Sequence, residues 1–204
     1  MTSRMNKLVK CVAVVCAIAV CLMLPGCAER VRVIKDPNDF DIAYDTSRLI
    51  KFEIVMEDDS VIEGELYPLV APITVRNFVT LAESGYYNGT SFNRVISDKL
   101  IQCSGTGGTA PYKIRGEFQD NGWKNTLSHL RGTLSMSHVA DEYDSAYSTF
   151  FILLENRTYY DGEYAAFGRI TSGLINCDNI SRVEVDGTTP VEPQTIREIN
   201  ILGN

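Results

Sequence analysis

The stretch SFNRVISDKLIQCS, residues 91–104, places one arginine and one glutamine among apolar residues at the spacing of a β-strand. In an extended chain Phe92, Arg94 and Ile96 fall on one side, and Gln102 follows on the next extended run. A guanidinium keeps its proton and offers five donors in a rigid plane, so on an apolar face it pairs with a carboxylate or awaits a ligand carbonyl. On spacing alone, a strand arginine whose head reaches solvent is the alternative.

The first 26 residues have the pattern of a secretory signal and not of a folded core. Three basic residues precede a nearly unbroken apolar run over residues 11–24, which is too short for a comfortable membrane span. The run ends in LPGC, residues 24–27, which resembles the bacterial lipobox, where the cysteine takes a diacylglyceryl thioether and becomes the mature N-terminus. We therefore expect a signal peptide over residues 1–26, lipidation at Cys27 and a position on the extracytoplasmic side of a bacterial cell membrane. The alternative is an uncleaved N-terminal anchor.

The net charge argues against a nucleic-acid partner. The chain has 204 residues with 19 basic and 26 acidic side chains, and three of the basic ones lie in residues 1–26. The mature chain therefore has 16 basic side chains against 26 acidic ones, a formal charge of −10. Phosphate binding relies on clustered Lys and Arg, which an anionic protein of this composition does not favour.

The cysteines and histidines indicate no metal site. Four of the six cysteines lie in residues 1–27, which leaves Cys103 and Cys177, and the sequence leaves open whether these two pair. His129 and His138 have no zinc-ligand spacing beside them, so a satisfied buried or surface histidine is expected for each. We expect no metal and no cofactor.

The rest of the chain reads as a spacer and one domain. Residues 27–47 are charged and rich in turn formers, and we expect them to be the lipidated N-terminus and a spacer to a domain over residues 48–204. The strands predicted in addition to those in residues 91–104 are 49–56, 61–67, 133–138, 150–154, 165–170 and 195–202, and the predicted helices are 72–85 and 173–183. Many short strands with two helices indicate a mainly β fold, a closed or nearly closed barrel capped by the helices.

With these segments laid out, several motifs in a fixed order resemble the cyclophilins. They are GYYNGTSFNRVI at 85–96, Gln102, HLRGTLSM at 129–136, STFFI at 148–152, YDG at 160–162 and FGRI at 167–170. The resemblance runs from about residue 48 to the C-terminus, and the lipobox makes it the bacterial lipoprotein form. It implies a closed eight-stranded antiparallel β-barrel capped by two α-helices, with peptidyl-prolyl cis-trans isomerase activity.

The resemblance also implies roles for individual residues. Arg94 stands at the position of the catalytic arginine, and Gln102 at that of the glutamine that assists it. Phe151 matches the aromatic floor of the proline pocket. Leu100 stands where the pocket usually has methionine, a swap of similar volume, and Tyr160 stands where it usually has leucine.

Other positions depart further from the family pattern. Lys99 replaces a pocket phenylalanine, and the sequence leaves its direction open. The remaining expected substrate contacts are Phe92, Ser137 and His138 in place of the usual Ala-Asn pair, Thr149 in place of a glutamine, Tyr159 in place of a tryptophan and Tyr164 in place of a histidine. These changes bear on substrate affinity and predict weak sensitivity to cyclosporin.

The predicted activity needs no nucleophile. A prolyl bond faces a barrier of about 18–20 kcal/mol from amide resonance, and no covalent bond must break to cross it. The resemblance thus implies a monomer that accelerates the folding of extracytoplasmic, proline-containing polypeptides, with Arg94 stabilising the twisted amide. The alternative is a non-catalytic, lipid-tethered peptide-binding or chaperone module on the same fold. A hydrolase built on Ser137 and His138 is set aside, because neighbours in a strand point to opposite faces.

Overall fold

The computed structural model of the protein describes residues 31–107 and 109–203. The expected signal peptide at 1–26 and the expected lipid site at Cys27 lie outside the described residues. Within the described part of the chain, no helix combines the length and the apolar character needed to cross a membrane.

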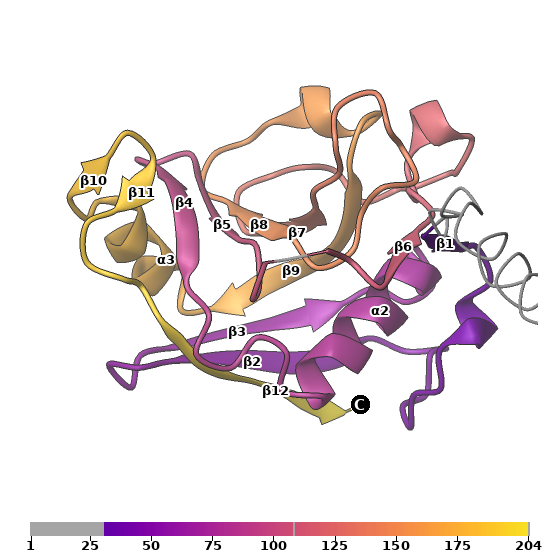
Figure 1. Ribbon diagram of the computed structural model, residues 1–204, viewed down its shortest axis with the longest axis horizontal. Coiled ribbons are helices and arrows are strands. Elements are labelled where there is room, and N and C mark those ends of the chain that lie inside the picture. Colours follow the sequence, from indigo (N-terminus) through magenta and orange to yellow (C-terminus); the bar gives the residue numbers. More distant parts are fainter. Residues whose placement is uncertain (1–30, 108, 204) are drawn as a thin grey trace, which may run out of the picture. The chain divides into compact units, whose positions relative to one another are not determined.

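Eight antiparallel strands form one strongly curled sheet (Figure 1). In spatial order they are β12 (Ile196–Gly203), β2 (Ile50–Met56), β3 (Val61–Leu66), β9 (Ala165–Ser172), β7 (Thr133–Met136), β8 (Phe150–Leu153), β5 (Leu100–Cys103) and β4 (Phe92–Ile96). All of them fall on stretches in which the sequence predicts strands. The predicted opening hairpin is confirmed by the β2–β3 pairing, in which Ile54 lies opposite Ile62.

The expectation of a closed barrel is wrong, because the sheet is open between β4 and β12. These two strands form the edges of the sheet. Only their adjoining ends are joined, by an isolated bridge between Ser91 and Thr195 and by backbone hydrogen bonds from Phe92 to Gln194 and from Ile196 to Thr90, within the described residues. Period-two alternation predicts which segments are strands, but the partner of an edge strand depends on the backbone groups that reach it from elsewhere in the chain.

A short hairpin lies along the edge of β4, where β12 would pair if the barrel were closed. It consists of β10 (Val185–Asp186) and β11 (Thr189–Pro190), which the sequence did not predict, and it lies beside β4 in Figure 1. The backbone N–H of Val95 in β4 donates to the carbonyl of Thr188 at 2.7 Å. The outer edge of β4 is therefore engaged by this hairpin and not by β12.

Two helices pack on the sheet, as the sequence predicts. Helix α2 (Pro72–Glu83) begins with a first-turn proline, and α3 (Leu174–Ser181) precedes the β10–β11 hairpin. From α2, Phe78 is fully buried and its ring contacts other buried rings, those of Phe52, Tyr87, Phe150 and Phe167, at centroid distances of 5.3–5.8 Å. These aromatic contacts fix α2 against the concave side of the sheet.

The segment expected to be a spacer is packed onto the domain from residue 31 onward. Strand β1 (Arg32–Ile34) pairs in parallel with β6 (Tyr112–Ile114), and the 3-10 turn η1 (Pro37–Asp39) follows it. Ile34 and Phe40 are both 6% exposed and join the main core. Over the described residues 31–47 the expected spacer therefore packs against the domain, because the buried side chains of Ile34 and Phe40 anchor it, while most of its other side chains are exposed.

The two cysteines of the domain are separate. Cys103 and Cys177 are both free thiols and both buried. Burial raises the pKa of each thiol, in the case of Cys177 to about 12. The disulfide that the sequence left open is not formed, and neither thiol has the character of a reactive thiolate.

Candidate active site

The two strands that carry the expected catalytic pair are neighbours in the sheet. Arg94 on β4 lies opposite Gln102 on β5, and Ile96 lies opposite Leu100. The guanidinium donates from Nη1 to Oε1 of Gln102 at 3.3 Å. On the other side of β5, Gln102 lies opposite Phe151 of β8. Three adjacent strands thus bring the expected arginine, glutamine and aromatic floor together.

The expectation that Phe92 shares a face with Arg94 is wrong. The register of β4 against β5 shifts between these two residues, so that Asn93 is an extra residue on β4. Because a bulge interrupts the alternation of faces, Phe92 turns inward, is fully buried and contacts the ring of Phe150 at 6.1 Å. Phe92 is therefore a core residue, and its side chain does not reach the substrate face.

The guanidinium of Arg94 keeps donors free for a ligand. Its side chain is half-buried, and within residues 31–107 and 109–203 no carboxylate forms an ion pair with it. Its charge acts on the hydroxyl of Tyr164, where burial raises the pKa and Arg94 opposes the rise. A cation that is held by a neutral amide and that faces a phenol can still donate to a further partner.

Beside Arg94 lies an apolar floor with aromatic walls. Phe151, Leu100 and Leu153 form a small buried cluster separate from the main core, and Tyr160 and Tyr164 pack against it. The ring of Phe151 lies 6.1 Å from that of Tyr160 and 5.6 Å from that of Tyr164, both edge-on. Such a surface suits a compact apolar ring. The expected contacts at Leu100, Phe151, Tyr160 and Tyr164 therefore lie together.

A buried polar group supports Phe151 from behind. His129 is fully buried, its ring is stacked at 22° to that of Phe151, and its Nδ1 lies 2.9 Å from Asp161 Oδ1 while its Nε2 lies 2.9 Å from Ser135 Oγ. Burial lowers the pKa of His129, so the neutral ring donates from Nδ1 to the carboxylate and accepts from the hydroxyl. Ser135 is fully buried, so this group acts on packing and not as a nucleophile. Sequence reasoning gave His129 no role beyond a satisfied histidine.

The hydroxyl of Tyr160 is held by a residue that sequence reasoning missed. Arg157 donates to Tyr160 Oη at 2.9 Å and forms an ion pair with Glu155. Its guanidinium also lies 5.5 Å from the centre of the Tyr160 ring. Tyr159, by contrast, is 66% exposed and stacks edge-on against Tyr160. Tyr160 is therefore a fixed wall of the pocket, and Tyr159 lies at its rim.

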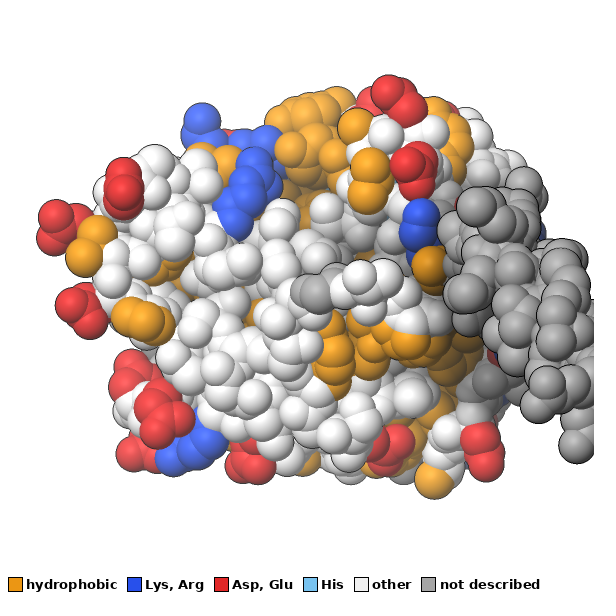
Figure 2. Space-filling model, viewed as in Figure 1, with side chains coloured by type: hydrophobic (Ala, Val, Ile, Leu, Met, Phe, Trp, Pro, Cys, Tyr) orange, Lys and Arg blue, Asp and Glu red, His pale blue; other side chains and the backbone are white. Residues whose placement is uncertain are grey.

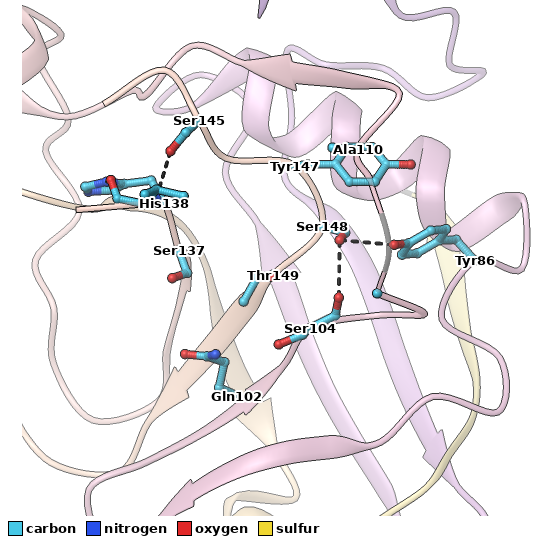
Figure 3. A pocket seen from close by; sticks show the side chains of 12 residues that line it. Tyr86, Gln102, Ser104, Ala110, Ser137, His138, Ser145, Tyr147, Ser148 and Thr149 are labelled. Atoms are coloured by element: carbon cyan, nitrogen blue, oxygen red, sulfur yellow. Dashed lines mark hydrogen bonds between the residues drawn. The ribbon is translucent and has the colours of Figure 1, made fainter. Parts of the chain in front are cut away.

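A cavity of about 380 Å³ adjoins the Arg94 pocket (Figure 3). Hydroxyl, amide and small side chains line it, and these belong to Tyr86, Gln102, Ser104, Gly107, Ala110, Ser137, His138, Val139, Ser145, Tyr147, Ser148 and Thr149. Figure 3 shows Gln102, Ser137 and Thr149 at one end and Tyr86 and Tyr147 at the other. Because Gln102 belongs to both, a chain bound over Arg94 can extend into this cavity.

His138 lies at the boundary of the cavity, and both of its ring nitrogens face backbone carbonyl oxygens. Nδ1 lies 2.8 Å from the carbonyl oxygen of Val139, and Nε2 lies 2.8 Å from that of Glu163. Its ring stacks on Phe118 at 5.2 Å. His138 therefore joins two loops beside the site, while Ser137 and Thr149, with their backbones hydrogen-bonded to each other, are the neighbours left at the cavity wall.

Lys99 is exposed at the turn between β4 and β5 and is not part of the apolar floor. Its backbone is fixed by hydrogen bonds to Ile96 and Leu154. In Figure 2 acidic side chains lie around the edge of the face, while a group of basic side chains lies over β4 and β5. The site thus has a locally positive surface on an acidic protein.

Comparisons with known proteins agree with this geometry. Residues 51–201 match the model of the family described as cyclophilin type peptidyl-prolyl cis-trans isomerase/CLD. Peptidyl-prolyl cis-trans isomerase B of Bacillus subtilis is 40% identical over 143 residues, which cover 68% of this chain and 95% of that protein. Peptidyl-prolyl cis-trans isomerase ppi1 of Schizosaccharomyces pombe is 40% identical over 139 residues, which cover 65% and 86%.

Solved structures show the same fold. A crystal structure of a Cryptosporidium parvum cyclophilin type peptidyl-prolyl cis-trans isomerase matches with a TM-score of 0.68 at 26% identity, over 77% of this chain and 99% of that chain. A crystal structure of the same protein in the presence of the dipeptide Ala-Pro matches with a TM-score of 0.67, over 76% and 99%.

Proposed function

This chain belongs to the cyclophilin-type peptidyl-prolyl cis-trans isomerases and is an isomerase of that family, and from this premise we propose that Arg94 is its catalytic group. In the twisted transition state the proline nitrogen becomes pyramidal and regains a lone pair. A fixed donor aimed at that nitrogen therefore stabilises the twisted transition state more than the planar ground state. Arg94 suits the task because it stays charged at every relevant pH.

The observation that carries this proposal is the pairing of Arg94 with Gln102 beside the Phe151 floor. The 3.3 Å hydrogen bond orients the guanidinium, and no ion pair within the described residues competes for it. The proline ring would rest on Phe151 and Leu100, with Tyr160 as a side wall. Proline-containing polypeptides are therefore the proposed substrates.

Arg94→Ala tests the mechanism in a protease-coupled prolyl peptide assay. We expect kcat/KM to fall by about 10²–10³, the usual effect of removing one electrostatic donor to a transition state, with an unchanged circular dichroism spectrum. Arg48→Ala is the matched control, because it removes an exposed guanidinium whose ion-pair partner, Asp45, is also exposed. Wild-type rates in Arg94→Ala would contradict the proposal. Peptide binding by the wild-type protein without any acceleration of prolyl exchange would favour the non-catalytic module.

We further propose that the enzyme works outside the cytoplasm as a monomer tethered by a lipid on Cys27. The support is the charged start, the apolar run and the LPGC sequence before residue 28. In that setting the proposed role is to accelerate the folding of proteins that have already crossed the membrane.

A further inference from the structure

One packed segment lies outside the region that matches the family. The family match covers residues 51–201, whereas the compact unit begins at residue 31. Residues 31–47 nevertheless contribute β1 and two buried side chains, those of Ile34 and Phe40, to the main core. This chain thus has a structural part that precedes the domain expected from its family.

The first link from this segment to the cavity is a row of aromatic rings. Phe40 contacts Tyr112 with ring centroids 5.8 Å apart, and Tyr112 contacts Tyr147 at 4.9 Å. Tyr147 in turn contacts Tyr86 at 5.7 Å, and these last two rings line the cavity. All of these contacts are edge-on, the geometry that aromatic pairs favour. Phe40 is therefore connected to the cavity wall at Tyr147 through one intervening ring, that of Tyr112.

Helix α2 holds the same rings by hydrogen bonds. Asn77 is fully buried, donates to the carbonyl oxygen of Tyr147 at 2.6 Å and accepts from the Tyr112 hydroxyl at 2.9 Å. Arg76, the residue directly before Asn77 on the helix, donates to the carbonyl oxygen of Phe40 at 3.1 Å. Through these hydrogen bonds, helix α2 holds Phe40 in the segment and both Tyr112 and Tyr147 on the way to the cavity wall.

The second link is a backbone and ion-pair connection to the loop before β8. The N–H of Arg115 donates to Ile34, and Ile114 donates to Ala146, the neighbour of Tyr147. Lys35 forms a 3.2 Å ion pair with Asp144 in that loop. The loop is thus joined to the segment directly by the Lys35–Asp144 ion pair and indirectly through the backbone of Ile114 and Arg115.

We propose that residues 31–47 are a positioning segment for the cavity wall, with Phe40 as its positioning residue. By holding Tyr147 and the loop before β8, the segment keeps the cavity open for the parts of a polypeptide that extend away from the proline. The inference rests on the proposed function, because it concerns the same bound chain. The two proposals predict changes in different kinetic constants. Replacing Arg94 should lower kcat, whereas replacing Phe40 should raise the KM of extended peptides.

The experiment compares Phe40→Ala with wild type in the full chain, using prolyl exchange by NMR on two substrates. One is a blocked Ala-Pro dipeptide, and the other is an extended peptide with residues on both sides of one Ala-Pro bond. We expect Phe40→Ala to raise the KM of the extended peptide about five-fold or more, with kcat within about two-fold and the dipeptide unaffected. Phe40→Leu should restore most of the loss, because it keeps apolar volume against Tyr112.

Two further variants keep the test decisive. Asp41→Ala changes an exposed neighbour of Phe40 and should leave both substrates unaffected. If Phe40→Ala does not fold, Lys35→Ala takes its place under the same criterion, since the Lys35 side chain is 63% exposed and its loss leaves no void. An unchanged KM for the extended peptide, or an equal change for both substrates, would overturn the inference, because a purely structural role would not distinguish the two.

Discussion

At the scale of the residue, a bulge in β4 decides which side chains face the proposed substrate pocket. Asn93 is the extra residue that turns Phe92 into the core while Arg94 stays on the pocket face. Without the bulge, alternation would place both on one side. The arginine therefore gains its position beside Gln102 from an irregularity in the strand that carries it.

This assignment of faces predicts opposite effects for two phenylalanines. Phe92→Leu should lower the free energy of unfolding by about 1–2 kcal/mol, because it removes atoms from a filled core, and should leave kcat/KM unchanged. Phe151→Leu should leave most of the stability and lower kcat/KM, because Phe151 is the proposed floor for the proline ring. Urea unfolding and prolyl exchange on the same samples measure both quantities. If kcat/KM falls as much in Phe92→Leu as in Phe151→Leu, the assignment of Phe92 to the core is wrong.

At the scale of the element, α2 is capped from a distant part of the chain. Its N-cap residue, Ala71, has no side chain that can cap. The carboxylate of Glu117 instead accepts from the backbone N–H groups of Ile73 at 3.0 Å and Thr74 at 2.8 Å. Glu117 is fully buried, and burial raises its pKa to about 7, although the two N–H donors act in the opposite direction.

The raised pKa makes the stability of the fold depend on pH. The folded state holds the Glu117 proton up to about pH 7, whereas the unfolded chain releases it near 4.5. The stabilisation from this group is therefore complete below pH 4.5 and lost as the pH rises through 7. Between pH 5 and pH 8 the unfolding free energy of wild type should fall by about 2–3 kcal/mol relative to Glu117→Gln, which does not titrate. Urea unfolding at the two pH values checks this, and a difference that stays constant would contradict it.

At the scale of the whole molecule, the packed segment shortens the proposed tether. Only residues 28–30 separate Cys27 from the start of the compact unit at Val31. An extended chain of that length spans at most about 14 Å. A lipid on Cys27 would thus hold the domain close to the membrane surface.

The proposed anchor predicts a specific mature N-terminus. Mass spectrometry of the protein extracted from bacterial membranes should give a chain that begins at Cys27 and is heavier than its polypeptide by a diacylglyceryl group, and labelled palmitate should be incorporated. Cys27→Ser should take up no label. A full-length chain that begins at Met1 and lacks lipid would instead support the uncleaved anchor.

The local features of this protein could be predicted from the sequence. Alternation and helical spacing predicted the eight strands of the sheet and both helices, and the order of motifs predicted that Arg94, Gln102 and Phe151 would meet. The strands and helices depend on neighbouring residues, and the site depends on motifs that a whole family shares. Both kinds of pattern can be recognised in the sequence.

Only the tertiary structure decided three other features. They are the inward turn of Phe92, the open edge where Val95 bonds to Thr188 and the packing of residues 31–47 around Phe40. Each depends on a contact between residues that are far apart in the sequence, either a hydrogen bond to a distant backbone group or packing against a distant apolar surface. The sequence by itself determined which segments form the eight-stranded sheet and which residues we propose to carry the chemistry. Which face each residue takes and where the fold begins follow from long-range contacts that no local pattern contains.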